Sequence, residues 1–264
     1  MKRKSLIIVL IVLIALFFVV QVWGTPYSAV QLTGYKALKT IAYYNNIRVN
    51  RDWDLQETNH FIINSKDIDS NTIESLGILF EKSYYLVGEE FDYYPNKKTP
   101  VIVYNTMSDF WNHIKPLAGQ DIMGLYYMGI IHIISPDVFD MDLNEYEKNG
   151  PILHEYTHKV VDDITGGNID LWLTEGLALY QEYINYDVEW GEGLVFDKEY
   201  TMEELRDNFL LLEPVQAYKQ SFEKVKNIYE TDKDKLIKLL TELGKGKKAK
   251  DVFLDIYEED VFNQ

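Results

Sequence analysis

Cysteine is absent from the 264 residues of the chain. That absence excludes disulfide bonds, thiolate metal ligands and a cysteine nucleophile together. A fold without disulfides is held by packing or by a metal ion, and 47% hydrophobic residues are enough for a sizeable core. Histidine is scarce as well, with five in the whole chain, so a motif that uses two of them is informative.

Positive charge is also sparse. The formal net charge is −16, and three of the 26 basic residues stand together at positions 2–4. Nucleic-acid binding depends on Lys and Arg clustered at the phosphates, so we expect no nucleic-acid partner. The simplest interpretation of the acidic surface is that it keeps the protein soluble.

One long apolar run lies near the N-terminus. Residues 6–20 are all apolar, and Val22 and Trp23 extend the run. Eighteen helical residues span roughly 27 Å, close to the thickness of a bilayer core. The basic cluster at positions 2–4 predicts that the N-terminus stays in the cytoplasm and that the rest of the chain lies outside. A cleaved signal peptide is the alternative, but no small-x-small cleavage site follows cleanly. We therefore predict a single-pass cell-membrane anchor over residues 6–23.

The predicted organisation is a cytoplasmic N-terminus (1–5), the anchor (6–23), a juxtamembrane segment (24–56) and one folded domain (57–264). Strands are predicted at residues 60–64, 101–104 and 124–135. Helices are predicted at residues 27–45, 71–88, 109–114, 149–165, 170–186, 202–209, 215–229 and 235–243, with a turn at 244–248. Because strands come early and helices late, we expect an α+β fold with a small N-terminal sheet and a helical C-terminal half.

The most informative motif is His-Glu-x-x-His, in the middle of the chain. On a helix, residues i and i+4 share one face about one turn apart, so His154 and His158 can reach one metal ion. Glu155 lies about 100° around the helix, beside the metal rather than on it. Pro151 at the start of this helix and Gly166 at its end are typical of real helix boundaries. The alternative is a pair of surface histidines on a solvated helix.

A catalytic zinc site needs a third protein ligand. Asp162 is too far away, because eight residues of helix separate it from His154, a rise of about 12 Å. The metzincin continuation His-x-x-Gly-x-x-His does not follow either. Glu175 comes seventeen positions after His158, on the next predicted helix, and a helical hairpin can return it to the first helix.

Residues 172–178 read Trp-Leu-x-Glu-Gly-x-Ala, and with the preceding His-Glu-x-x-His they resemble the signature of the gluzincin metallopeptidases. The sequence looks most like the membrane alanyl aminopeptidases and the bacterial peptidase MA-like domains. The resemblance implies a gluzincin-like catalytic domain with one Zn²⁺ held by His154, His158 and Glu175. It also implies that Glu155 is the catalytic base and that the partner is a peptide or protein substrate.

Two further residues are weaker candidates. Residues 217–221 follow the Ala-Tyr-x-x-Ser pattern of the MA-like domains, which implies that Tyr218 can donate a hydrogen bond to an oxyanion. His132 lies on a predicted strand before the metal motif and can contact substrate there. The alternative is that His132 is simply a partly buried strand residue.

The sequence departs in two places from the families that it resembles. Aminopeptidases carry Gly-Ala-Met-Glu-Asn before the zinc helix, with a glutamate that holds the substrate's α-amine. Residues 128–132 stand at the comparable place and contain no acid, so we do not expect a dedicated aminopeptidase. Thermolysin-like enzymes have an aspartate four positions after the third ligand, but this chain has Leu179, which leaves the partner of His154 unassigned.

Together these features predict a membrane-anchored, extracytoplasmic zinc-dependent metallopeptidase. A non-catalytic, membrane-tethered binding or regulatory module on a peptidase scaffold is the alternative, because fold alone does not imply activity. Metal-dependent hydrolysis of a bond other than a peptide is a third possibility. The intact base, Glu155, favours catalysis over a binding module.

Overall fold

The computed structural model describes residues 29–49, 52–114, 122–196 and 198–257. The predicted cytoplasmic N-terminus and the predicted anchor at 6–23 lie outside these residues. Within the described ranges, no helix combines the length and the apolar character needed to cross a bilayer.

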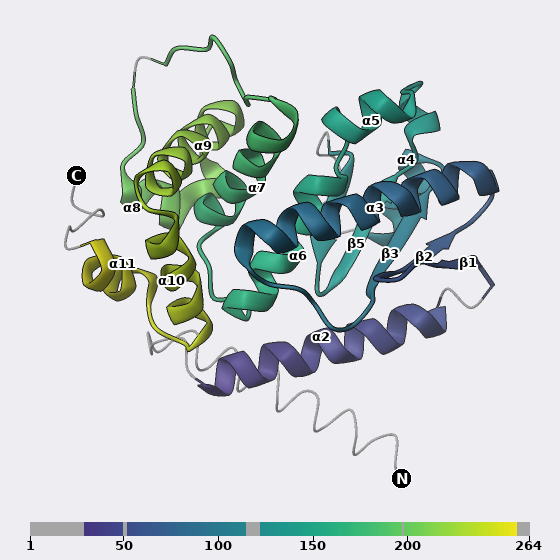
Figure 1. The fold of residues 1–264 in the computed structure, drawn as a ribbon, viewed down its shortest axis with the longest axis horizontal. Coiled ribbons are helices and arrows are strands. Elements are labelled where there is room, and N and C mark those ends of the chain that lie inside the picture. Colours follow the sequence, from purple (N-terminus) through teal and green to yellow (C-terminus); the bar gives the residue numbers. More distant parts are fainter. Residues whose placement is uncertain (1–28, 50–51, 115–121, 197, 258–264) are drawn as a thin grey trace.

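Five strands of the described residues form one mixed sheet, in the order β1-β2-β3-β5-β4 (Figure 1). The strands are β1 (Asp54–Glu57), β2 (Phe61–Ser65), β3 (Thr99–Tyr104), β4 (Gly124–Tyr127) and β5 (Ile130–Ile134). β2, β3 and β5 run parallel, whereas β1 and β4 are antiparallel to their neighbours and form the two edges. The predicted α+β class is confirmed, with the sheet in the N-terminal half and helices in the C-terminal half.

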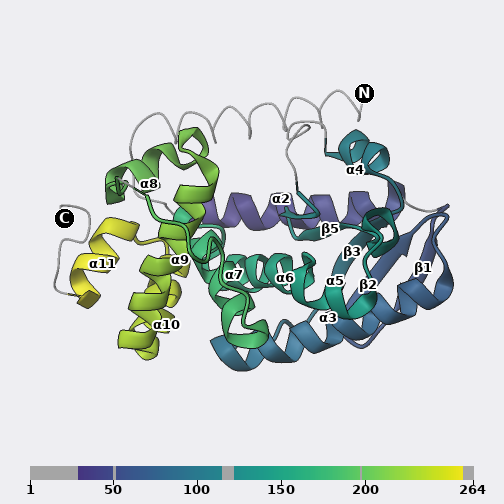
Figure 2. The ribbon, with the colours of Figure 1, turned by 90° about the horizontal axis from the view of Figure 1, so that it is seen from above.

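Helices cover both faces of the sheet and then build the C-terminal half. The α-helices of the described residues are α2 (Ala29–Val49), α3 (Ser70–Phe91), α4 (Met107–His113), α5 (Leu143–Asn149), α6 (Ile152–Thr165), α7 (Leu171–Tyr186), α8 (Met202–Asn208), α9 (Pro214–Thr231), α10 (Lys233–Gly244) and α11 (Ala249–Tyr257), with short 3₁₀ turns η2 (Pro136–Phe139) and η3 (Phe209–Leu211). α3 and α6 pack on one face of the sheet, whereas α2 and α4 lie on the other (Figure 2).

Alternation along β5 divides the apolar side chains between two cores. Ile131 and Ile133 are buried in the larger core, which includes residues of α3, α6 and the C-terminal helices. Ile130 and Ile134 belong to the smaller core, together with Phe110 of α4. Successive side chains of a strand point to opposite faces, so the sheet separates the two cores. Residues of β5 one position apart therefore meet different surroundings.

The connection from α6 to α7 is tight. α6 ends at Gly166, whose φ of 65° makes the left-handed cap expected from the sequence, and the Gly166 N–H donates to the carbonyl of Asp162. Gly167 follows with a φ of 78°. On the other side of α7, a Cβ on Gly176 would lie 2.4 Å from the carbonyl oxygen of Ser221 on α9. α7 is therefore held between α6 and α9, which fixes the face that it turns toward α6.

The single strand predicted for residues 124–135 is wrong, because the chain forms β4, turns back and forms β5. Met128 and Gly129 make the turn with φ values of 52° and 87°. Two positive φ values in succession are typical of the tight turns that join antiparallel strands. Methionine is not a turn residue, so the apolar run resembles one strand. The prediction also omitted β1, α5 and α11, while the other predicted elements are present with ends that differ by a few residues.

Candidate metal centre

The α6–α7 hairpin brings the three predicted metal ligands together. His154 Nε2 lies 3.2 Å from Glu175 Oε2, and His158 Nε2 lies 3.5 Å from the same oxygen. The three donor atoms are all within 4.8 Å of one another. For ligands about 2.0–2.1 Å from a tetrahedral zinc ion, neighbouring donor atoms are about 3.3 Å apart. The two distances to Glu175 match this value, so the donor set can hold a metal ion.

The second nitrogen of each imidazole has a partner of its own. His158 Nδ1 lies 2.8 Å from Thr174 Oγ1, and His154 Nδ1 lies 3.4 Å from Glu182 Oε1. Such partners fix the orientation of a ligating imidazole and raise its basicity. Both rings therefore turn Nε2 toward Glu175, an orientation in which one metal ion could bind all three side chains.

Glu182 is a residue of the candidate site that the sequence did not predict. Position 179, where an aspartate would support the first histidine, holds a buried leucine. Glu182 takes this place from one turn farther along α7. It comes seven residues after Glu175, and residues seven apart share a helix face two turns apart. An acidic residue at that spacing was the signal in the sequence.

The electrostatics of the ligands favour a bound cation. Burial lowers the pKa of His154, but the carboxylates of Glu182 and Glu175 outweigh it and raise that pKa well above 6.5. Burial raises the pKa of Glu175, but His158 and His154 outweigh it and hold that pKa far below its usual range. The cluster therefore favours positive charge beside the Glu175 carboxylate, and a metal ion bound there would displace a proton from the imidazole.

Glu155 lies beside the ligands and not among them. Its carboxylate oxygen Oε2 accepts a hydrogen bond of 2.6 Å from the backbone N–H of Tyr126 on β4. Burial raises the pKa of Glu155, and the neighbouring His158 and His154 oppose that effect. A carboxylate with a raised pKa is suited to accept a proton during a reaction.

The edge strand β4 approaches the start of α6 closely at this point. A Cβ on Gly124 would lie 2.5 Å from Pro151 Cβ and 3.0 Å from Glu155 Cγ. A side chain at position 124 would therefore push the strand away from the helix. Glycine at that position allows β4 to reach the Glu155 carboxylate.

Tyr218 on α9 is electrostatically coupled to the site. Burial raises its pKa well above 10, and the charges of Glu175 and Glu155 raise it further. The phenol therefore stays protonated and can donate a hydrogen bond. Its ring contacts Trp190 and Phe209, with centroids 5.9 and 5.4 Å away.

His132 is separated from the metal ligands by the sheet. It lies on β5 between Ile131 and Ile133, so its side chain points to the opposite face, where Tyr104 Oη is 2.9 Å from His132 Nδ1. Burial lowers the pKa of His132 to about 3, and the nearby His113 acts in the same direction. The structure therefore places His132 as a buried strand residue and not beside the ligands.

No protein-family model matches the chain and no curated protein matches it. Two imidazoles and one carboxylate form a donor set typical of zinc in hydrolytic sites, where a fourth position stays open. The residues present therefore fit a zinc ion.

Proposed function

We propose that the chain is a zinc-dependent metallopeptidase of the gluzincin type. The observation that carries the proposal is the convergence of two imidazole Nε2 atoms on one Glu175 oxygen, at 3.2 and 3.5 Å. The resemblance of the two motifs to the gluzincins supports the same assignment. Under this proposal His154, His158 and Glu175 hold the zinc ion.

The chemistry at the site divides between the metal and the protein. A zinc ion, when bound, acts as a Lewis acid that acidifies a water molecule and polarises a carbonyl. Glu155 takes the proton from the attacking water and passes it to the leaving nitrogen. Because Oε2 of Glu155 accepts the Tyr126 N–H, the other oxygen, Oε1, is assigned to this transfer. The Tyr218 hydroxyl is assigned to stabilise the developing oxyanion.

A peptide substrate fits the position of β4. This strand ends the sheet, and a strand at an edge presents backbone N–H and C=O groups to an extended chain. Peptides are commonly recognised by adding such a strand. β4 also carries the N–H that holds Glu155, so a peptide on its free edge would lie beside the proposed base.

The test separates metal binding from chemistry with the substitution Glu155→Gln. The amide keeps the size of the side chain but cannot accept the proton. We expect the variant to retain about one zinc per chain and the wild-type melting temperature, while cleavage of a peptide library falls at least about a hundredfold. Zinc is measured by mass spectrometry, and Glu145→Gln on the exposed surface of α5 is the matched control.

Three outcomes contradict the proposal. A wild-type chain without zinc removes the metal site. A Glu155→Gln variant that cleaves at the wild-type rate removes Glu155 from the mechanism. A wild-type chain that binds zinc but cleaves no peptide favours the non-catalytic module or hydrolysis of another bond.

A further inference from the structure

Tyr126 of β4 contacts α6 at two points. Its backbone N–H donates to Glu155, 2.6 Å away, and its hydroxyl donates to Asp162 Oδ2. Glu155 and Asp162 are seven residues apart on α6, about 10 Å along one face of the helix. Tyr126 therefore lies along the helix, with its main chain at the proposed base and its phenol two turns away.

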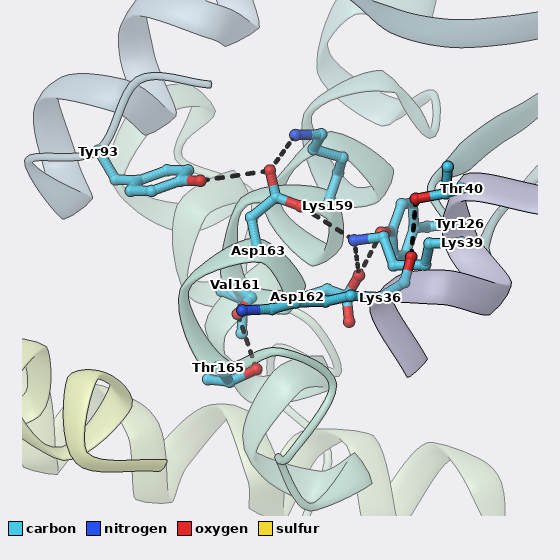
Figure 3. A network of polar contacts seen from close by, with 10 residues as sticks. All are labelled: Lys36, Lys39, Thr40, Tyr93, Tyr126, Lys159, Val161, Asp162, Asp163 and Thr165. Atoms are coloured by element: carbon cyan, nitrogen blue, oxygen red, sulfur yellow. Dashed lines mark hydrogen bonds and ion pairs between the residues drawn. The ribbon is translucent and has the colours of Figure 1, made fainter. Parts of the chain in front are cut away.

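Asp162 of α6 is in turn held by Lys39 of α2. α2 lies on the other face of the sheet from α3 and α6 (Figure 2). Lys39 Nζ lies 2.5 Å from Asp162 Oδ2 and 2.9 Å from Asp163 Oδ1 (Figure 3). Lys159 pairs with Asp163, whose Oδ2 also accepts the hydroxyl of Tyr93 at 3.4 Å. Two lysines and two aspartates thus form a balanced cluster that links α2, α6 and β4.

Burial makes this cluster interdependent. Only 6% of the Asp162 surface is exposed, and a buried carboxylate is stable only with a paired cation and satisfied oxygens. Lys39 supplies the cation, and Tyr126 supplies the second donor to Oδ2. Burial and the charge of Asp162 raise the pKa of Tyr126 well above 10, so its hydroxyl stays protonated and donates.

We propose that Tyr126 is a positioning residue for Glu155, and that α2 fixes Tyr126 through Lys39 and Asp162. β4 is paired on one side only, so its contacts with α6 set where the Tyr126 N–H lies. A displacement of about 1 Å at a catalytic group can cost about a hundredfold in rate. The inference rests on the proposed function, because the benefit of fixing Glu155 is catalytic.

The first test uses Tyr126→Phe and Asp162→Asn in the full-length chain. Tyr126→Phe removes the hydroxyl, and Asp162→Asn removes the negative charge that pairs with Lys39 and strengthens the bond from that hydroxyl. Both changes leave the Tyr126 N–H in place. We expect zinc content and KM to stay unchanged, while kcat for peptide cleavage falls about ten- to a hundredfold. Tyr127→Phe is the matched control, because that ring is 58% exposed on the same strand, and it should leave kcat unchanged.

The second test does not depend on activity. Hydrogen exchange of the Tyr126 amide, measured on the zinc-free chain, reports whether its bond to Glu155 is held. We expect exchange at least about tenfold faster in Tyr126→Phe, Asp162→Asn and Lys39→Met, since each loosens the strand from α6. Lys39→Arg should restore slow exchange, and Lys36→Met, an exposed change on the same helix, should have no effect.

The outcomes separate this inference from the proposed function. Unchanged exchange in all three variants contradicts the link from α2 to Glu155, whatever the activity. Faster exchange with unchanged kcat contradicts the positioning role. A wild-type chain that cleaves no peptide contradicts the proposed function, and exchange alone then decides whether α2 and Tyr126 hold Glu155.

Discussion

The two histidines of the candidate metal centre differ in the partner that supports each imidazole. The two histidines of α6 both turn Nε2 toward Glu175, but His158 is supported by the neutral hydroxyl of Thr174, whereas His154 is supported by the carboxylate of Glu182. A charged partner stabilises positive charge on the imidazole more strongly than a hydroxyl does. His154 is therefore the ligand whose basicity depends on one residue outside the metal motif.

The substitution Glu182→Gln should weaken zinc binding at this site. The amide can still contact Nδ1 of His154 but removes the negative charge. We expect zinc affinity to fall about ten- to a hundredfold, as for other partners of ligating histidines. Competition with a chelator measures the affinity. Glu192→Gln, an exposed change beyond the end of α7, is the control, and equal zinc affinity in both variants would assign His154 another support.

At the scale of elements, α7 owes its position to close packing against α9. A Cβ on Gly176 would lie 2.4 Å from the Ser221 carbonyl oxygen and 2.5 Å from Val225 Cγ2. Ser221 itself is buried, and its Oγ donates to the carbonyl of Ala217 within α9. Gly176 and Ser221 therefore allow α7 and α9 to pack closely. This packing explains why both residues are small, and it requires no chemical role for either of them.

We expect Gly176→Ala to be destabilising although alanine is the better helix former. Extra volume in a packed contact costs typically about 1–3 kcal/mol, and here the nearest atom belongs to the backbone. The displaced α7 should also carry Glu175 away from the histidines, so zinc affinity should fall with stability. Urea denaturation and zinc titration measure the two effects. Gly34→Ala is the control, since on α2 a Cβ meets nothing within 4 Å.

The contacts of Glu81 on α3 with Thr58 and His60, just before β2, should make the stability of the fold depend on pH. Glu81 accepts hydrogen bonds from Thr58 Oγ1 at 2.5 Å and from the backbone N–H of His60 at 2.8 Å, and His60 Nδ1 lies 2.7 Å from its other oxygen. Burial raises the pKa of Glu81, but these contacts outweigh it and lower the pKa below 4.5. A carboxyl whose folded pKa is lowered stabilises the fold above its unfolded pKa and loses that effect as the pH falls through the folded value.

We therefore expect Glu81→Gln to be destabilising at pH 7 by at most about 1.5–3 kcal/mol, the range for hydrogen bonds to charged groups. The difference from wild type should begin to shrink as the pH falls below about 4.5, and it should vanish once the pH is below the lowered folded pKa, where the wild-type carboxyl is protonated as well. Urea denaturation at pH 7 and at a pH below the folded pKa of Glu81, with a chelator present, measures this difference in stability. Glu74→Gln, exposed on the same helix, should show neither effect, and a pH-independent difference would contradict the assignment.

At the scale of the whole molecule, α2 connects the start of the described residues to the helix that carries both histidines. It begins at Ala29, shortly after the predicted anchor ends, and its Lys39 reaches Asp162 and Asp163 on the helix that carries both histidines. We propose that the protein is a single-pass cell-membrane protein whose catalytic domain lies outside the cytoplasm. In that arrangement α2 would join the anchor to the domain as a packed element.

The basic start and the apolar run at residues 6–23 predict where the protein is found. We expect cell fractionation to leave the full-length chain in the membrane, with its C-terminus accessible to protease from outside. Replacing two apolar residues of the run by lysine should release it, because charges at the centre of a membrane helix are costly. A soluble mature form that begins near residue 25 would instead establish a cleaved signal peptide.

The sequence by itself determined the α+β class, most of the elements and the three candidate ligands that the α6–α7 hairpin brings together. His154, His158 and the cap at Gly166 obey rules that act within a few turns of one helix, and Glu175 follows because a short turn must return the next helix to the first. The α+β class follows from the order of strands and helices along the chain. These inferences need no information about residues far away in sequence.

Only the tertiary structure decided which distant groups complete the site. Glu182, rather than residue 179, supports His154 because the crossing of α6 and α7 sets which turn faces the ring. His132 points away from the ligands because the register of β5 assigns each residue to one face, and a shift of one position would reverse it. Tyr126 meets Glu155 because Met128 and Gly129 turn the chain into a hairpin. Such contacts depend on helix crossings and strand register, which local patterns of residues do not specify.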